Sequence, residues 1–307
     1  MPERQTGRVV AVLIVVGLLA TAAVLFALGR GRRDGAGSRG NPVVLILSPS
    51  HGDASVAARL GAALSTSSGL TIEVRSARTR AEAVAATGLA SVDGGILPIF
   101  DYLLAHQEFG VRAGLQLVRG DGERATAGVI LVRDDSPITA LTQLAGQPIA
   151  FVDRSSTTGY LLAARLLQEQ RIDVRPVFTG DHVASLSQLT AGTVAAAATY
   201  RHQRAGLRVI AAAGTVPNEP LFFHPRLPDA TRDRILAAFV GLATTTDGRA
   251  LLGQLAEATG VAPIDDAAYG EVNDLLAATR QRLVDLVPEG RRLVERRHQP
   301  VPPPMGQ

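Results

Sequence analysis

Residues 147–167 read Gln147-Pro-Ile-Ala-Phe-Val-Asp-Arg-Ser-Ser-Thr-Thr-Gly-Tyr-Leu-Leu-Ala-Ala-Arg-Leu-Leu167. The apolar run Ile149–Val152 predicts a short strand, and Tyr160–Gln170 predicts a helix with a continuous apolar face. The turn between them carries four hydroxyl residues, Ser155, Ser156, Thr157 and Thr158. The start of a helix leaves up to four backbone N–H groups without partners and carries partial positive charge. The turn therefore suits a tetrahedral oxyanion, although a plain Ser/Thr helix cap would use the same residue types.

Strand and helix signals alternate along the body of the chain from residue 43. The strand-like runs Val43–Leu47, Thr71–Arg75 and Gly94–Leu97 are each followed by a predicted helix, and the alternation continues through Ile149–Val152. This alternation predicts α/β layers with mainly parallel sheets, in which ligands bind where strand ends meet helix starts. Towards the end of the chain the pattern predicts helices only, at Arg232–Thr244, Gly248–Ala258 and Tyr269–Val287.

The turn described first belongs to a wider resemblance. Phe151-Val-Asp-Arg-Ser-Ser-Thr-Thr-Gly-Tyr-Leu161 resembles the F-V-D-P-x-S-T-S-G-Y-L segment of the phosphate/phosphite/phosphonate solute-binding proteins of ABC importers. Phe178-Thr-Gly-Asp-His-Val-Ala184 is similar to that family's F-x-G-x-H-D-A segment. Leu97-Pro-Ile-Phe-Asp-Tyr-Leu-Leu-Ala105 is similar to its G-P-x-x-Y-x-x-A turn, with one extra residue. Later landmarks follow in the family's order: Pro217-Asn218, Leu227-Pro228 and Thr246-Asp-Gly248.

The resemblance implies a two-lobed α/β fold of the periplasmic-binding-protein type II class, with a ligand cleft between the lobes. Residues 41–133 and 215–290 would form the first lobe, and residues 134–214 the second. Residues 1–40 would form a membrane anchor or signal segment with a linker, and residues 291–307 a flexible tail.

The resemblance also implies a set of ligand-binding residues. Ser155, Ser156, Thr157 and Thr158 would donate to an oxyanion from the second lobe. His182 matches the family's pocket histidine, and its ring would donate to an anionic oxygen; a lone histidine near a helix start is otherwise a local cap or surface residue.

On the first lobe, Tyr102 matches the family's aromatic residue. The extra residue before it leaves its direction open, and the alternative is an ordinary interior tyrosine. Ser48 and Ser50 follow the first strand, where the first lobe would face the cleft. Two serines around a proline are also common turn chemistry, so the sequence leaves both readings open.

Three positions depart from the family pattern. Ser76-Ala-Arg-Thr79 stands where the family has an aromatic residue, Val194-Ala-Ala-Ala197 lacks the acid of V-D-A-A, and Val183 replaces an aspartate. A site short of carboxylates suits a ligand without an ammonium group. Arg78 or Arg80 is a candidate to pair with a phosphonate or phosphate instead.

The twenty residues Val9–Leu28 carry no charge and are long enough to span a bilayer. Cleavage of a signal peptide after Ala20-Thr-Ala22 is the alternative, but Ala23–Leu28 continues the apolar run beyond that point. Four arginines follow the segment and two precede it, which by the positive-inside rule alone would keep the body cytoplasmic. The importer resemblance implies the opposite orientation. We therefore expect a single-pass protein of the cell membrane with its soluble body on the extracytoplasmic side.

Composition excludes several classes of function. The chain has no cysteine, which excludes disulfides, thiolate catalysis, Cys-ligated metals and a lipid-modified cysteine tether. Residues 1–40 carry six arginines against two acids, a surplus of +4 that exceeds the net charge of +3 of the whole chain. The nearly neutral remainder, in a chain with 4% aromatic residues, gives no reason to expect nucleic-acid binding.

We expect a monomer that binds a small oxyanion and delivers it to an ABC permease with its ATPase, without cofactor, metal or catalysis. One alternative is a sensor domain of the same fold that signals to a membrane partner. Another is a hydrolase, because Asp153, Ser155 and His182 offer the side chains of acyl transfer. No G-x-S-x-G turn or H-E-x-x-H pair occurs, and a phosphate loop ending in Gly-Lys is impossible because the chain has no lysine.

Overall fold

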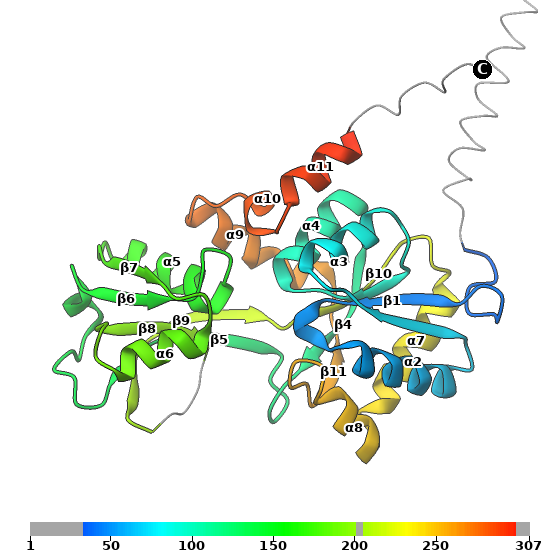
Figure 1. The fold of residues 1–307 in the computed structure, drawn as a ribbon, viewed down its shortest axis with the longest axis horizontal. Coiled ribbons are helices and arrows are strands. Elements are labelled where there is room, and N and C mark those ends of the chain that lie inside the picture. The colour runs from blue at the N-terminus through cyan, green and yellow to red at the C-terminus, as the bar shows by residue number, and fades with distance from the viewer. Residues whose placement is uncertain (1–32, 201–204, 299–307) are drawn as a thin grey trace, which may run out of the picture.

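A computed structural model describes residues 33–200 and 205–298. These residues form two lobes, each built on one β-sheet with helices packed against it (Figure 1). The first lobe holds a six-stranded sheet and the second a five-stranded sheet. This is the two-lobed α/β architecture that the sequence predicted.

The six-stranded sheet has the strand order β11-β4-β10-β3-β1-β2. Its strands are β1 (Val43–Leu47), β2 (Ile72–Ser76), β3 (Gly94–Ile96), β4 (Arg112–Val118), β10 (Pro220–Phe223) and β11 (Gly260–Pro263). A short 3-10 turn, η1 (Pro49–His51), follows β1. Helices α2 (Ala54–Ser68), α7 (Asp229–Leu242) and α8 (Thr246–Leu252) lie on one side of the sheet, and α3 (Arg80–Gly88) and α4 (Ile99–Phe109) lie on the other (Figure 1).

Strand β1 is apolar throughout because both of its faces are buried. Val43, Leu45 and Leu47 belong to the cluster that includes α2 and α7. Val44 and Ile46 belong to the cluster that includes α3 and α4. A strand covered on both sides shows a continuous apolar run rather than an alternating one, which is why the sequence pattern locates it well.

The five-stranded sheet has the order β7-β6-β8-β5-β9. Its strands are β5 (Ala125–Arg133), β6 (Pro148–Phe151), β7 (Arg175–Phe178), β8 (Ala196–Tyr200) and β9 (Leu207–Pro217). Its helical elements are the 3-10 turn η2 (Leu141–Leu144), the π-helical turn η3 (Thr157–Leu161), α5 (Leu162–Glu169) and α6 (His182–Thr190). Helix α5 shares a core cluster with Ile130, whereas α6 shares a different cluster with Leu131, so the two helices cover opposite faces.

Both sheets are mixed, which corrects the prediction of mainly parallel sheets. Strand β1 pairs in parallel with β2 and β3, and β6 pairs in parallel with β7 and β8. Strand β10 is antiparallel to β3 and β4, β11 is antiparallel to β4, and β5 is antiparallel to β8 and β9. The physical reason is that the chain passes from one lobe to the other before β5 and again before β10. Each of these strands starts at the edge next to the crossing segments, where the parallel strands of that lobe end, so it runs opposite to them.

Two segments cross between the lobes. Residues 119–124 join β4 to β5, and residues 218–219 join β9 to β10. Because β5 pairs with β8 and β9, the change of sheet falls before Ala125, whereas the predicted boundary at residue 133 coincides with the end of β5.

The side chain of Asn218 ties the two crossing segments together. It is buried, and its Nδ2 donates to the carbonyls of Leu117 and Glu123 at 3.0 and 2.9 Å. Its Oδ1 accepts the hydroxyl of Thr126 at 2.7 Å, and its carbonyl accepts the hydroxyl of Tyr269 at 2.9 Å. One amide therefore fixes the start of the second lobe to the return of the chain into the first.

The C-terminal elements are η4 (Asp266–Tyr269), α9 (Gly270–Ala278), α10 (Leu283–Leu286) and α11 (Gly290–His298). Helix α9 lies between the lobes (Figure 1) and contacts α5 of the second lobe. Residues 291–307 were predicted to be a flexible tail, but helix α11 extends to His298 and its Leu293 is buried in the core cluster. Residues 299–307 lie outside the described residues.

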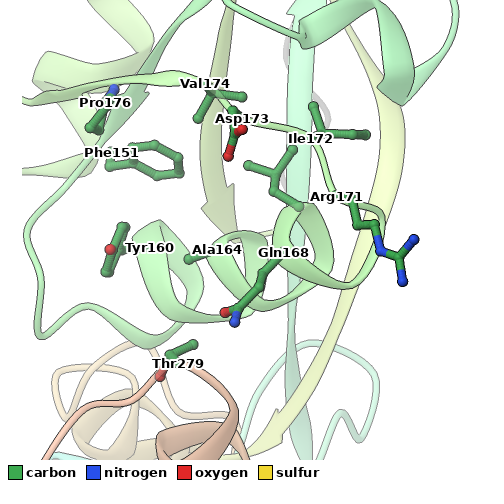
Figure 2. A pocket seen from close by; sticks show the side chains of 11 residues that line it. Phe151, Tyr160, Ala164, Gln168, Arg171, Ile172, Asp173, Val174, Pro176 and Thr279 are labelled. Carbon is green, nitrogen blue, oxygen red and sulfur yellow. The ribbon is translucent and has the colours of Figure 1, made fainter.

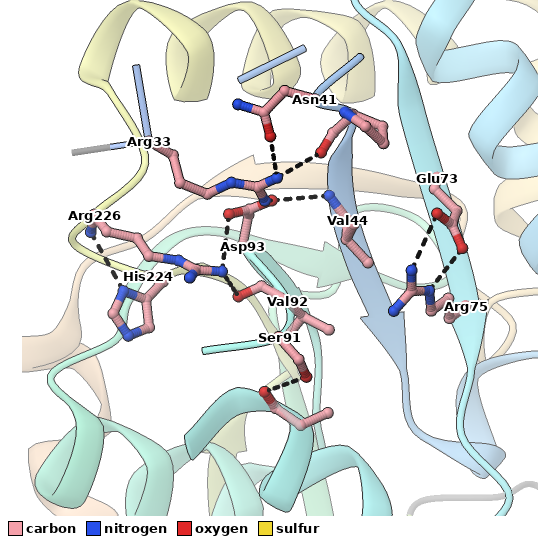
Figure 3. Close-up of polar contacts among 12 residues, drawn as sticks. Arg33, Asn41, Val44, Glu73, Arg75, Ser91, Val92, Asp93, His224 and Arg226 are labelled. Atoms are coloured by element: carbon pink, nitrogen blue, oxygen red, sulfur yellow. Dashed lines mark hydrogen bonds and ion pairs between the residues drawn. The ribbon is translucent and has the colours of Figure 1, made fainter. Parts of the chain in front are cut away.

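The predicted linker is partly docked on the first lobe (Figure 3). Asp93 is fully buried, pairs with the guanidinium groups of Arg33 and Arg226, and accepts the backbone N–H of Val44 at 2.9 Å. Arg33 also donates to the side chain of Asn41 and to the carbonyl of Pro42. Residues 33–42 are therefore held against the end of the sheet where β1 begins.

The predicted membrane segment Val9–Leu28 lies outside the described residues. Among the residues that are described, no single helix is long and apolar enough to cross a membrane; α7 and α8 pass that test only as a pair, bent by 104°.

Candidate functional site

The predicted strand-to-helix turn of the second lobe forms a capped helix start. Ser156 is the N-cap of η3, and its hydroxyl accepts the backbone N–H of Gly159 at 3.1 Å. A side chain at Gly159 would not fit, because its Cβ would lie 2.4 Å from Cγ2 of Val152 and 2.7 Å from the Ser156 hydroxyl. The glycine is thus required by the close approach of the helix start to the end of β6.

The other three hydroxyls of this turn differ in their surroundings. The backbone N–H and the hydroxyl of Ser155 both donate to Oδ1 of Asp153 at 2.6 Å, so Ser155 is engaged locally. Thr158 is buried and Thr157 is half-buried. Neither threonine hydroxyl forms a hydrogen bond with another described residue. Among the described residues, Thr157 and Thr158 are therefore the residues of the turn whose hydroxyls have no hydrogen-bond partner.

His182 is the first residue of α6, another helix start. The preceding Asp181 caps this helix by accepting the N–H of Ala184 at 2.7 Å. The His182 ring bonds through Nδ1 to the hydroxyl of Thr199 at 2.9 Å, and packs edge-on against Tyr200 with 4.8 Å between ring centroids. These contacts fix the imidazole against the end of β8.

The structure places these second-lobe residues at one edge of the sheet. Strands β6, β7 and β8 are parallel, so their C-terminal ends share an edge. Residues 155–158 follow β6, His182 follows β7, and Thr199 lies near the end of β8. Tyr200 is level with Gly128 near the start of β5, where the chain enters from the first lobe. This edge therefore faces the crossing segments.

Ser48 and Ser50 lie on the corresponding edge of the first lobe. Ser48 follows β1, and its backbone N–H donates to the carbonyl of Ile96 at the end of β3. Its hydroxyl is fully buried and has no hydrogen-bond partner among the described residues. Ser50 is exposed, and its hydroxyl lies 3.1 Å from Nδ1 of His51.

This first-lobe edge also faces the crossing segments. Ile96, at the end of β3, is level with Leu221 at the start of β10, and Pro220 is level with Gln116 in β4. The C-terminal ends of β1, β2 and β3 thus lie where the chain passes to and from the second lobe. The predicted serines of the two lobes are therefore on edges that border the same crossing segments.

Tyr102 lies away from this edge, in the interior of the first lobe. Its ring is fully buried and contacts Tyr269 and Phe222. Its hydroxyl donates to Asp266, and the backbone N–H of Ala113 donates to it at 3.1 Å. Burial raises the pKa of the hydroxyl, and the Asp266 carboxylate raises it further. The environment is that of the interior tyrosine considered as the alternative, and the structure does not bring Tyr102 together with the serines and threonines.

One ion pair at the first-lobe edge was not identified from the sequence. Asp101 stands three residues after Pro98, where the family motif has its tyrosine, because the extra residue moves Tyr102 one position along α4. Asp101 is fully buried and bonds to Arg80, the first residue of α3, at 2.6 and 2.9 Å. Arg78 is exposed and pairs with Glu82 instead.

A second charged group lies where the crossing segments leave the first lobe. Arg119 donates to Glu219 at 2.7 Å. Both charged groups interact electrostatically with the buried ring of His51. Burial lowers the pKa of His51; Glu219 raises it and Arg119 lowers it. The Glu219 pKa is lowered by His51, Arg119 and a hydrogen bond, against a burial effect that raises it. This cluster couples the turn after β1 to the crossing segments.

A separate pocket of about 470 Å³ lies in the second lobe between α5 and the strands β6 and β7 (Figure 2). Phe151, Tyr160 and Leu167 line it together with the polar Gln168 and Asp173. Thr279, which follows α9, borders it from the other side. None of the predicted site residues lines this pocket, and no cluster of metal-binding side chains occurs in residues 33–200 and 205–298.

Comparisons with solved structures support the fold. A Xanthomonas citri protein bound to ATP matches with a TM-score of 0.63 and 20% identity, over 80% of this chain and 99% of that one. The binding protein component of an ABC phosphonate transporter from Pseudomonas aeruginosa matches with a TM-score of 0.60 and 16% identity, over 83% and 94%. A Prochlorococcus marinus protein in complex with methylphosphonate matches with a TM-score of 0.61 and 12% identity, over 78% and 99%.

At these identities the structures show the shared fold and leave the ligand open. A search of curated proteins returns no match. A family model described as "ABC transporter, phosphonate, periplasmic substrate-binding protein" matches residues 48–269, which is most of the chain and includes both sheet edges. The chain therefore belongs to the phosphonate-type periplasmic substrate-binding proteins of ABC transporters.

Proposed function

We propose that this chain is an extracytoplasmic solute-binding protein that captures a phosphonate, phosphite or phosphate-type oxyanion between its lobes and presents it to an ABC permease. The observation that carries the proposal is the helix start at Ser156–Gly159. There, two threonine hydroxyls without partners among the described residues stand beside the backbone N–H groups of the first helical turn. Such a helix start favours an anion through its N–H groups and its partial positive charge.

His182 supports the same assignment from a second helix start on the same edge. Its Nδ1 is directed to Thr199, which fixes the orientation of the ring. In the neutral tautomer that carries its proton on Nε2, the ring would accept the Thr199 hydroxyl and donate to an anionic oxygen. Ser48 supplies a further donor from the first lobe, because its buried hydroxyl has no partner in the described part of the chain. Donors from both edges would bring the lobes together around the ligand.

Calorimetry on the purified full-length chain tests this proposal. The panel contains methylphosphonate, phosphite, phosphate, methanesulfonate and sulfate. We expect saturable binding of at least one phosphorus oxyanion and no chemical change in the recovered ligand. A folded sample that binds no member of the panel at millimolar concentration would refute the proposal.

Small-angle scattering of the same sample tests the closing of the lobes. A ligand held by both edges should reduce the radius of gyration, since each lobe supplies only part of the ligand's hydrogen bonds. An unchanged radius at saturation would mean that one lobe holds the ligand alone.

We further propose that the body is tethered on the extracytoplasmic side by Val9–Leu28. The support is the uncharged twenty-residue segment together with membership of a periplasmic binding family. An export-dependent reporter fused after Gln307 should be active in cells, and N-terminal sequencing of the mature protein should find residues upstream of Ala23. An inactive reporter would refute the orientation, and a mature N-terminus at Ala23 would replace the anchor by a cleaved signal.

A further inference from the structure

The ion pair between Arg80 and Asp101 stands on the same edge as Ser48. Nε of Arg80 donates to Oδ2 of Asp101 at 2.9 Å, and Nη2 donates to Oδ1 at 2.6 Å. The Asp101 side chain is 0% exposed, whereas the Arg80 side chain is 30% exposed. The carboxylate is thus fully covered, whereas part of the Arg80 side chain remains exposed.

The order of the strands places this pair around the end of β1. Arg80 begins the helix that follows β2, and Asp101 lies in the first turn of the helix that follows β3. Strand β1 lies between β2 and β3 in the sheet. The pair therefore joins the two strand ends that flank Ser48, whose hydroxyl is buried without a partner among the described residues.

The geometry of the pair leaves part of the guanidinium group for another partner. Asp101 engages Nε and Nη2, so Nη1 is not committed to the pair. Burial raises the pKa of Asp101, and the hydrogen bond from Arg80 opposes that rise. The planar fork is held in one orientation, which favours an oxygen acceptor placed in its plane.

Carboxylates at the two edges are already engaged within the chain. Asp153 accepts from Ser155, Asp181 from the N–H of Ala184, and Glu219 from Arg119. Asp53 caps α2 by accepting the N–H of Val56 at 2.9 Å, and Asp101 is paired with Arg80. These carboxylates are held by partners within the chain, whereas a ligand carboxylate would meet the exposed part of Arg80.

From these contacts we infer the ligand class: a phosphonate or phosphate ester that carries a second acidic group, such as a carboxylate, at the end remote from phosphorus. Arg80 binds that second group from the first lobe, and Asp101 positions the guanidinium. The inference rests on the proposed function, because the phosphorus end is assigned to the Thr157 turn. In this inference Arg80 determines which oxyanions bind, in addition to attracting negative charge.

Calorimetry with three probes on the full-length chain tests the inference. The probes are phosphonoacetate, methylphosphonate and 2-aminoethylphosphonate. We expect the wild-type chain to bind phosphonoacetate roughly tenfold or more tighter than 2-aminoethylphosphonate, as one charged hydrogen bond gained implies. Tighter binding of the amine would overturn the inference.

Two arginines two residues apart provide a matched comparison. In Arg80→Gln we expect affinity for phosphonoacetate to fall roughly tenfold and affinity for methylphosphonate to change less than about twofold. Arg78→Gln should leave both unchanged, since the Arg78 side chain is 90% exposed and pairs with Glu82. Equal losses for both probes in Arg80→Gln, or no loss for either, would overturn the inference.

Arg80→Lys serves as the second variant if Arg80→Gln does not fold. It keeps a positive charge beside Asp101 but loses the planar fork, so the preference for phosphonoacetate over methylphosphonate should shrink. An undiminished preference would overturn the inference. The proposed function is tested separately. If the wild-type chain binds any probe and the Arg80 variants bind as it does, only the inference about Arg80 is refuted. If the wild-type chain binds none of the three probes and neither phosphate nor phosphite, the proposed function is refuted as well.

Discussion

Two buried aspartates in the first lobe show how the two ends of one sheet are used differently. Asp93 lies at the end where β1 begins and pairs with two arginines and a backbone N–H. Asp101 lies beyond the end where β3 finishes and, within the described part of the chain, pairs with Arg80 alone. Both side chains are fully buried. The first carboxylate is surrounded by groups of the same chain, whereas the second leaves its arginine partly exposed at the proposed ligand edge.

We infer from this difference that Asp93 serves the fold, whereas Asp101 positions Arg80 at the proposed site. A buried charge that lacks compensation is costly, so a carboxylate with several fixed partners within the chain stabilises the fold around it. A carboxylate with one half-exposed partner holds that partner for another contact. The predictions below test this distinction, from the largest expected effect to the smallest.

The largest effect should follow Asp93→Asn. The substitution keeps the shape of the side chain but leaves the guanidinium groups of Arg33 and Arg226 without a counter-ion. The free energy of unfolding should therefore fall by about 3–5 kcal/mol. Urea denaturation followed by circular dichroism measures this. A loss of unfolding free energy below about 1 kcal/mol would mean that water hydrates the two arginines in the variant. Asp93 would then contribute no more to stability than Asp101.

Thr157→Ala and His182→Ala should weaken binding of a phosphorus oxyanion by about 1.5–3 kcal/mol each, because each removes a donor to a charged ligand. The denaturation midpoint of Thr157→Ala should stay close to that of the wild-type chain, since no hydrogen bond joins the Thr157 hydroxyl to another described residue, whereas His182→Ala also loses the contacts with Thr199 and Tyr200 and should be somewhat less stable. Ser155→Ala is the matched control, as its hydroxyl is engaged by Asp153. Normal binding in both test variants would place the oxyanion elsewhere.

Asp101→Asn should cost about 1 kcal/mol of folding stability, much less than Asp93→Asn. Neutralising Asp101 removes the burial penalty that raises its pKa, and the exposed part of Arg80 remains hydrated. The same urea titration provides the value. If the two asparagine variants were equally destabilised, the distinction between the two ends of the sheet would fail.

The smallest effect concerns pH. Burial lowers the pKa of His51 and of His224 in the folded protein, while the unfolded side chains titrate near 6.5. As pH falls below about 6.5 the unfolded chain takes up protons that the folded chain does not, so stability should fall towards acid pH. His51→Gln should flatten this slope when melting temperatures are compared between pH 7.5 and 5.5. An identical slope in the variant would remove His51 from the account.

The sequence pattern located the buried parallel strands and their following helices well. Strand β1 is covered on both faces, and its five apolar residues could form little else. Strand β10 was missed, because Pro220–Phe223 is short, begins with proline and gains its place only by pairing with β3 and β4. Pairings of this kind join residues far apart in the chain, so no local pattern contains them.

The candidate site shows the same limit. The capped turn at Ser155–Thr158 could be predicted because capping is a local property of a helix start. The direction of Tyr102 could not, since one inserted residue rotates the following helical positions by about 100°. That rotation brings Asp101 into contact with Arg80, twenty-one residues earlier in the chain. The family motif alone predicted an aromatic residue where the fold places an ion pair.

The docking of residues 33–42 has a consequence for the geometry of transport. Ten residues that are bound to the lobe cannot extend, which removes about 30 Å of reach from any tether that precedes Arg33. Arg33 itself lies at the end of the sheet where β1 begins, opposite to the end that carries Ser48 and Arg80. If Val9–Leu28 tethers the body as proposed, a shorter free linker would confine the body to a smaller volume near the membrane and raise its effective concentration at a permease there. In that arrangement Arg33, which binds the segment to the lobe through Asp93, would help to set the length of the free linker.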